Sequence, residues 1–188
     1  MGSSERETII RKLAFVGTSR VGKTTILEHF KKSFAGNPNV AFVEEAARTF
    51  FRQNPQIKDR FSVDTQGQIQ ALALRNERDI HQSGARIIFC DRSVIDAVVY
   101  VRSQGDKKGS DELLERVKMW LPTYHKFLLF DPVDIPYETD DIRQETSETR
   151  QKFHDAFLTF FKETNIPYEL LSGTKEERIK RVTEIIEG

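Results

Sequence analysis

The chain has 188 residues, enough for one domain with a substantial hydrophobic core of its own. Its 29 basic and 29 acidic residues give a formal net charge of zero, which argues against a protein that coats nucleic acid but leaves room for a local basic cleft. The single cysteine, Cys90, excludes an intramolecular disulfide and favours a reducing compartment. Because no apolar run is long enough to span a bilayer and residues 1–12 lack the apolar core of a secretory signal, we expect a cytoplasmic protein with no membrane partner.

Short apolar runs rich in β-branched and aromatic residues alternate with longer segments of helical period, which is typical of a parallel sheet wrapped by helices. The predicted strands are Lys12–Val16, Val40–Val43, Arg86–Cys90, Lys126–Phe130 and Tyr168–Leu171. Several of them are apolar at consecutive positions, as expected of strands that are covered on both faces. The sequence therefore predicts an α/β fold.

Helix-period segments fill the intervals between these strands. The predicted helices are Lys23–Phe34, a segment from Glu45 to the Asn54–Pro55 break, Thr65–Gln82, Asp111–Trp120 with Ser110 as its cap, a phenylalanine-rich segment after Arg150, and Thr174–Glu187. Residues 104–110 are interpreted as a polar connector and residues 136–150 as a charged excursion. We expect one domain over residues 1–188, with its core at 8–188 and residues 1–7 disordered.

The stretch GTSRVGKTT matches the phosphate-binding pattern G-x-x-x-x-G-K-[ST], with a predicted strand before it and a predicted helix after it. Glycines in such a loop allow successive backbone N–H groups to turn inward at a helix N-terminus, where they bind a polyphosphate. Lys23 is expected to reach the β- and γ-phosphates, and the Thr24 hydroxyl to bind Mg²⁺. The predicted nucleotide-binding residues are Gly17, Thr18, Ser19, Arg20, Val21, Gly22, Lys23, Thr24 and Thr25.

The stretch DTQGQ, residues 64–68, resembles the D-x-x-G-Q segment of small GTPases, in which a glutamine orients the attacking water. A GTPase also reads guanine through an N-K-x-D segment, and no such segment occurs in this chain. Asp64 and Thr65 are common residues at the start of a helix, so helix capping is the favoured interpretation of this stretch.

Charged residues follow the second and third predicted strands. Glu44, Glu45 and Arg48 follow the second predicted strand, and Asp91 and Arg92 come directly after the third. Ligands bind at the carboxyl ends of strands in sheets of this kind. Asp91 is expected to hold Mg²⁺ together with Thr24, and Arg92 to contact the substrate. Either Glu44 or Glu45 is expected to accept a proton from a substrate hydroxyl, and the sequence does not choose between the two.

Two arginines of the charged excursion are candidates for transition-state stabilisation. Arg143 and Arg150 are seven residues apart, so they would share one helical face. An arginine delivered by a closing lid stabilises the charge that develops during phosphoryl transfer and excludes water. The sequence therefore predicts a lid at 136–150.

Taken together, these motifs resemble the NadR-like P-loop kinases and ATPases, which include the nicotinamide riboside kinase domain of a bacterial regulator of NAD biosynthesis. The resemblance covers nearly the whole chain, through GTSRVGKTT, FVEEAAR, DRSVIDAVVY, FLLFDPVDIPYETDDIRQE and NIPYELL. It implies a five-stranded parallel sheet of order 2-3-1-4-5. It also implies that residues 17–25 hold the ATP phosphates, that Asp91 lies in the metal and substrate region, and that Glu44, Glu45 and Arg48 line the acceptor site.

The motifs and the resemblance lead to one functional hypothesis and two alternatives. We expect a kinase that uses Mg²⁺ and transfers the γ-phosphate of ATP, with GTP not excluded, to a small nucleoside-like or nucleotide acceptor. Compounds like nicotinamide riboside are among the candidate acceptors. The main alternative is a regulatory ATPase or GTPase switch with a protein partner. A nucleic-acid end kinase is a third class, which the neutral charge balance disfavours. The oligomeric state is not determined by the sequence.

Overall fold

Five parallel strands form the centre of the molecule, which was analysed as a computed structural model that describes residues 10–133 and 147–188. The strands are β1 (Arg11–Val16), β2 (Val40–Val43), β3 (Ile87–Asp91), β4 (Lys126–Phe130) and β5 (Tyr168–Leu171). Their order in the sheet is β2-β3-β1-β4-β5, and every pairing is parallel. The predicted α/β class and strand order are confirmed. Residues 1–9 and most of the predicted lid, including Arg143, lie outside the described residues.

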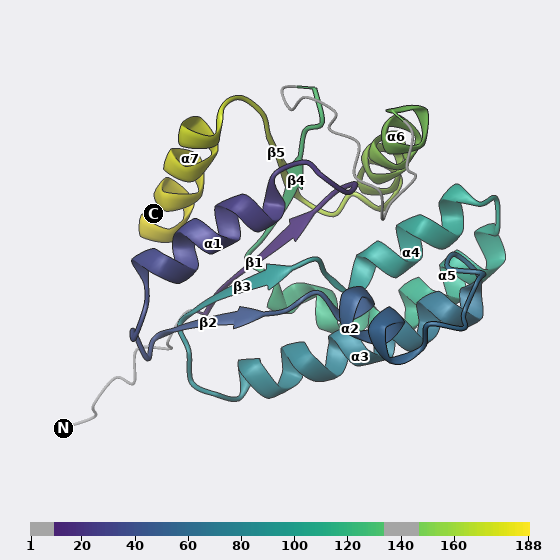
Figure 1. The fold of residues 1–188 in the computed structure, drawn as a ribbon, viewed down its shortest axis with the longest axis horizontal. Helices are drawn as coiled ribbons and strands as arrows, with labels where there is room; N and C mark the ends of the chain where they lie inside the picture. Colours follow the sequence, from purple (N-terminus) through teal and green to yellow (C-terminus); the bar gives the residue numbers. More distant parts are fainter. Residues whose placement is uncertain (1–9, 134–146) are drawn as a thin grey trace.

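Helices connect the strands and cover both faces of the sheet (Figure 1). They are α1 (Lys23–Ser33), α2 (Ala46–Gln53), α3 (Val63–His81), α4 (Val94–Ser103), α5 (Lys107–Val117), the 3₁₀ helix η1 (Lys118–Thr123), α6 (Ser147–Thr164) and α7 (Lys175–Glu187). In the described part of the chain, no helix has both the length and the apolar character that a bilayer crossing requires.

Alternating side chains of the strands enter two separate hydrophobic cores. Leu13 and Phe15 of β1 pack with α1 and α7 on one face of the sheet, whereas Ala14 and Val16 pack with α4, α5 and α6 on the other. Figure 1 shows the corresponding three layers, with α1 and α7 on one side of the strands. Because both faces are covered, the strands are apolar at consecutive positions, as the sequence predicted.

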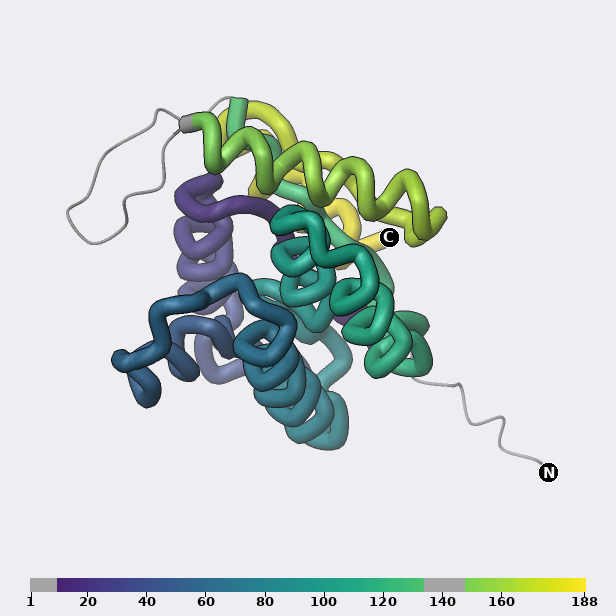
Figure 2. The backbone as a smooth tube through the Cα atoms, turned by 90° about the vertical axis from the view of Figure 1, so that its right-hand side faces the viewer, coloured from purple at the N-terminus to yellow at the C-terminus, as the bar shows by residue number. Residues whose placement is uncertain are grey.

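All five strands point toward the same side of the molecule. Figure 2 views the molecule from this side and shows the loop after β1, the α2–α3 segment and α6 arranged around it. In parallel α/β sheets this carboxyl edge is where ligands bind, because the loops that follow the strands converge there. The fold therefore brings together the segments on which the sequence placed the candidate site.

Helix α4 was not predicted from the sequence. Its sequence, VIDAVVYVRS, is apolar on nearly all sides, and residues from Val94 to Val101 are buried apart from Tyr100. A helix buried on all sides lacks the amphipathic period on which the prediction depended. One signal was present, since Ser93 and Asp96 form a reciprocal capping box at its start.

Two predicted helix starts also need correction. Helix α5 begins at Lys107, not at Asp111, because the Asp106 side chain accepts from the Gly109 N–H; the predicted connector 104–110 therefore contributes its last four residues to a helix. In α3 the cap is Ser62, which accepts from the Thr65 N–H, so DTQGQ lies within the first turns of that helix. The expected helix around Trp120 is a 3₁₀ helix that includes Pro122.

A buried charged cluster joins the start of β1 to α3. The ammonium of Lys12 pairs with the carboxylate of Glu77, and both side chains are about fully buried. Trp120 and Tyr124 donate hydrogen bonds to the same carboxylate, and Lys12 lies over both aromatic rings. The ion pair is thus enclosed by groups that satisfy it, which is the condition under which a buried pair is tolerated.

We expect Glu77→Leu to destabilise the protein by about 3–5 kcal/mol, because it leaves the Lys12 ammonium buried without its counter-charge. The matched control is Glu115→Leu, which removes the exposed Lys118–Glu115 pair and should change stability by less than about 1 kcal/mol. Urea unfolding at pH 7 measures both variants. Equal losses in the two variants would contradict the proposed role of the buried pair.

Candidate functional site

The phosphate-binding loop connects the end of β1 at Val16 to the start of α1 at Lys23, as predicted. Gly17 and Gly22 adopt φ values of 126° and 84°, which side chains rarely allow. A Cβ on Gly17 would also lie 3.2 Å from the carbonyl oxygen of Phe130 on the neighbouring strand. Both glycines are therefore required by the backbone path that forms the loop.

Lys23 lies inside the loop and is buried. Its Nζ donates to the carbonyl oxygens of Gly17, at 3.0 Å, and Thr18. Burial, together with the nearby guanidinium of Arg92, lowers the pKa of Lys23 to about 7, although Asp91 and other carboxylates oppose the shift. The loop thus holds a lysine that is only partly charged near pH 7.

The donor set at the mouth of the loop fits Mg²⁺. The side chain of Thr24 is exposed, and Asp91 stands half-buried at the end of β3. A hydroxyl and one carboxylate are oxygen ligands, and Mg²⁺ takes only one or two such ligands from the protein when a nucleotide supplies the rest. The described residues contain no cluster of three or more potential metal-binding side chains, so this site would depend on the bound nucleotide.

Burial also perturbs the carboxyl of Asp91. It raises the pKa of Asp91, the Lys23 charge lowers it, and the negative charge of Glu45 raises it again. The interacting groups Lys23, Asp91 and Glu45 belong to α1, β3 and the segment after β2. The structure therefore brings charged groups from three separate segments into one electrostatic cluster.

A cavity of about 720 Å³ opens beside the phosphate loop. It extends from Ser19 of the loop to side chains of α2, α3 and α4, and it has both charged and aromatic walls. The sequence-predicted residues that border it are Ser19, Glu44, Glu45, Arg48, Asp91 and Arg92. The residues that the sequence analysis did not assign to the site include Phe51, Phe61, Gln66, Gln70, Asp96 and Tyr100.

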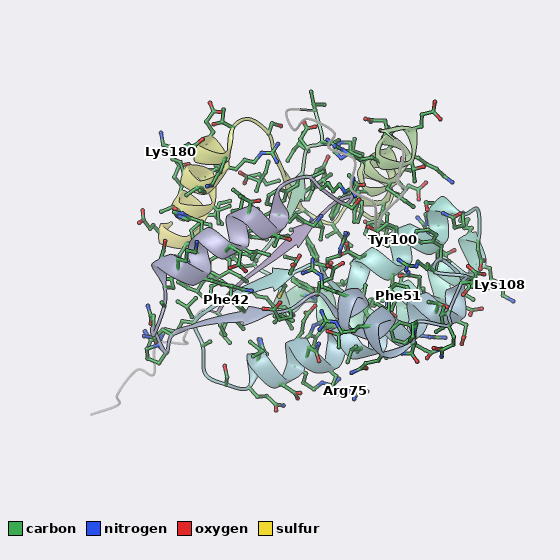
Figure 3. All side chains as sticks on the ribbon, viewed as in Figure 1. Phe42, Phe51, Arg75, Tyr100, Lys108 and Lys180 are labelled. Atoms are coloured by element: carbon green, nitrogen blue, oxygen red, sulfur yellow. The ribbon has the colours of Figure 1, made fainter. Side chains whose placement is uncertain are left out.

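Two aromatic side chains of this cavity can be followed in Figure 3, where Phe51 and Tyr100 lie toward the end of the molecule to which the strands point. They come from α2 and α4, and Phe61 packs against Tyr100 with ring centroids 5.6 Å apart. The cavity therefore has planar apolar surfaces as well as charged groups, as expected of a site that binds a ring.

Arg92 connects the phosphate loop to the cavity. Its Nη1 donates to the Gly17 carbonyl at 2.7 Å, to Asp96 Oδ1 at 3.0 Å and to the Tyr100 hydroxyl at 2.7 Å. Its Nε donates to Glu45 Oε1 at 3.2 Å. The backbone of Arg92 has a φ of 75°, which is uncommon outside glycine and indicates that its surroundings fix its conformation.

The structure separates the two adjacent glutamates that the sequence could not distinguish. Glu45 is 8% exposed, occupies the N-cap position of α2 without a capping hydrogen bond from its side chain, and forms ion pairs with Arg92 and Arg48 at 3.2 Å. The carboxylate of Glu44 is exposed and pairs with Lys31 of α1 at 2.7 Å. Although Glu44 also borders the cavity, only the Glu45 carboxylate is held by the Arg92 network.

Arg150 of the predicted lid lies in the first turn of α6 and is buried. Its guanidinium donates to the carbonyl oxygen of Pro132, just after β4. Arg150 is not among the residues that border the cavity. Arg143 lies outside the described residues.

The phosphate loop has a second support that sequence reasoning missed. Arg178 of α7 is almost completely buried, and its guanidinium donates at 2.9 Å to the carbonyl oxygens of Val21, Asp131 and Gly173. It therefore ties the phosphate loop to the ends of β4 and β5. An arginine in an amphipathic surface helix gives no sequence signal for this role.

Comparisons with known proteins agree with this geometry. A family model described as AAA domain, AAA_28, matches residues 12–178. No curated protein matches the chain by sequence.

Solved structures with a similar fold belong to several kinases and to NadR. A structure of NadR in complex with NR is 21% identical to this chain, with a TM-score of 0.71. A structure of NadR in complex with NAD and AMP-PNP is 20% identical, with a TM-score of 0.68. Each match covers 96% of this chain and 50% of the NadR chain. Thymidylate kinase from Ehrlichia chaffeensis is 17% identical, with a TM-score of 0.63 over 95% and 99% of the two chains. The chain spans half the length of the NadR structures.

The low pKa of Lys23 predicts that ATP binding takes up a proton. At pH 8 the Lys23 side chain of the free protein is about nine-tenths neutral. Because a bound polyphosphate favours the charged form, we expect an uptake of about one proton on ATP binding. For the same reason, the affinity for ATP should fall as the pH rises above about 7. Calorimetry at pH 8 in buffers of different ionisation enthalpy measures this uptake.

The control for this experiment is another lysine of α1. Lys31 lies near the surface, and hydrogen bonding to Glu44 raises its pKa, so Lys31→Met should leave the proton uptake unchanged. Lys23→Met should abolish the uptake and weaken binding. Binding of ATP to the wild-type protein at pH 8 without proton uptake would contradict the prediction.

Proposed function

The chain belongs to the AAA_28 family of AAA domains, and from this premise we propose that it is a P-loop kinase that transfers the γ-phosphate of ATP to a small nucleoside-like or nucleotide acceptor. The observation that carries the proposal is Arg92, which joins the phosphate loop to the neighbouring cavity through Gly17 and Glu45. ATP in the loop and the phosphate acceptor in the cavity would then lie on opposite sides of the Arg92 guanidinium. We propose that residues 1–188 act as a single domain.

The proposed step is an in-line displacement at the γ-phosphorus. An acceptor hydroxyl oxygen forms the new bond to phosphorus while the bond to the bridging oxygen of ADP breaks, and the electron pair leaves with ADP. The hydroxyl proton passes to a carboxylate of the cavity. Little covalent chemistry is required of the protein, so positioning and charge stabilisation account for most of the rate.

We assign the proton acceptor to Glu45. Its carboxylate is buried in the cavity wall, and the Arg92 and Arg48 guanidinium groups hold it in one orientation. The exposed ion pair of Glu44 with Lys31 makes that residue the weaker candidate. Arg48 and Arg92, which were expected to bind the substrate, would then act mainly by orienting the carboxylate.

The loop residues supply the electrostatic part of the mechanism. Lys23 becomes charged on binding the phosphates and neutralises part of the charge that develops on the migrating group. Thr24 and Asp91 are the residues that would hold Mg²⁺, which would neutralise part of the negative charge of the phosphates. We propose that Arg143 and Arg150 belong to a lid that closes over the transition state, with Arg150 anchored on Pro132.

A regulatory ATPase or GTPase remains the alternative function. A switch that only hydrolyses nucleotide needs no second cavity beside its phosphates, whereas this chain has one of about 720 Å³ with buried carboxylates in its walls. The cavity is therefore the feature that favours transfer to an acceptor. The NadR complexes with NR and with AMP-PNP are consistent with an acceptor of nucleoside size.

The proposed function is tested by following the terminal phosphate. Incubation with γ-labelled ATP, and separately GTP, and a panel of nucleosides, nucleotides and a 5′-hydroxyl oligonucleotide should transfer label to a small nucleoside or nucleotide at least tenfold faster than to water. Chromatography of the products identifies the acceptor. Label that reaches only water across the panel would favour the switch, and label on the oligonucleotide would favour an end kinase.

The two glutamates provide a matched pair of variants. Glu45→Gln should lower kcat by about 100-fold or more, because it removes the proton acceptor and the charge that orients Arg92. Glu44→Gln should lower kcat by less than about threefold, because only an exposed ion pair is lost. Steady-state kinetics with the acceptor found above measures both. Similar losses in the two variants would remove Glu45 from this role.

A further inference from the structure

The helix α3 side of the cavity contains a glutamine that is fixed in one orientation. Gln70 is 3% exposed and borders the cavity. Its Nε2 donates to the carbonyl oxygen of Val94 at 3.0 Å and to that of Leu113 at 3.1 Å. These carbonyls belong to α4 and α5, so three helices hold one amide group.

Both N–H groups of this amide are therefore occupied, and the amide cannot turn over. A flipped amide would place its oxygen against two carbonyl oxygens, which repel it. The Gln70 Oε1 atom accepts no hydrogen bond from the described residues. These residues do not enclose it fully, so the atom is accessible to a ligand. Gln70 thus presents a lone acceptor to the cavity.

The position of this acceptor relates it to the reacting groups. Val94, whose carbonyl fixes Gln70, begins α4 two residues after Arg92, whose guanidinium orients Glu45. The aromatic side chains of Phe51 and Tyr100 border the same cavity and offer flat surfaces to a ring. A ring in the cavity could therefore direct one edge at Gln70.

We infer that Gln70 selects acceptors whose ring carries an N–H donor, such as an amide or an exocyclic amine, and rejects those with only oxygen acceptors at that edge. This inference rests on the proposed function, because it takes the cavity as the acceptor site. A fixed acceptor discriminates strongly, since a ligand without the donor leaves the buried oxygen unpaired, and a carboxylate in its place is repelled.

The test compares two pairs of nucleosides that differ at one ring edge. Nicotinamide riboside and nicotinic acid riboside differ by an amide against a carboxylate, and cytidine and pyrimidin-2-one riboside differ by an amine against hydrogen. In whichever pair the protein phosphorylates, the nucleoside with the ring N–H donor should have a kcat/KM at least tenfold higher than its partner. Calorimetry should give the same preference for binding in the absence of ATP.

A variant and its control assign the preference to one side chain. Gln70→Met keeps the length of the side chain but removes the acceptor, so the ratio within the pair should fall toward one. Gln68→Met changes an exposed glutamine of the same helix, whose side chain donates to Asp64, and should keep the wild-type ratio. A folded Gln70→Met protein that keeps the wild-type preference overturns the inference.

Two further outcomes separate this inference from the proposed function. Wild-type protein that binds both members of each pair equally, or binds none of the four, overturns the inference whether or not Gln70→Met folds. Wild-type protein that binds the N–H member selectively but transfers no phosphate to it supports the role of Gln70 and contradicts the kinase assignment. Phosphate transfer to both members of a pair with equal kcat/KM supports the kinase assignment and contradicts the role of Gln70.

Discussion

The guanidinium group of Arg92 contacts the phosphate loop, the capping residue of α2 and the side chains of α4, and the arrangement of the site depends on it. Each of these segments follows a different strand, and the Arg92 guanidinium is a partner that they share. A planar group with five donors suits this task, because it can satisfy a carbonyl and two carboxylates in fixed directions. The left-handed backbone of Arg92 is a cost that these contacts offset.

A consequence of this arrangement is a high density of charge in a poorly hydrated region. Lys23 and Arg92 repel each other, and burial disfavours both the Lys23 ammonium and the Asp91 carboxylate. The site without nucleotide is therefore electrostatically strained, and the negative charge of a polyphosphate relieves the strain on its cationic side. This relief of strain would favour the proposed binding of a polyphosphate even though the lysine is partly neutral.

Stability is provided away from the reacting groups. The enclosed Lys12–Glu77 pair fixes β1 to α3, and Arg178 fixes the phosphate loop to the ends of β4 and β5. Both use charged groups in buried positions, where a unique set of partners is required to satisfy them. Glu77 also borders the cavity, so the same network that stabilises the sheet supports the α3 wall.

The sequence by itself determined the five strands, most of the helices between them and the phosphate loop, because these depend on local periodicity and on the backbone freedom of Gly17 and Gly22. It also placed Glu45 and Asp91 at the ends of strands that share one edge of the sheet. It missed α4, whose apolar surroundings remove the helical period, and it could not choose between Glu44 and Glu45. Those two residues are neighbours in the chain with the same chemistry, and only the tertiary packing decides which carboxylate meets Arg92 and which meets Lys31. The fixed orientation of Gln70 was equally inaccessible, since it results from carbonyl groups 24 and 43 residues away in the chain.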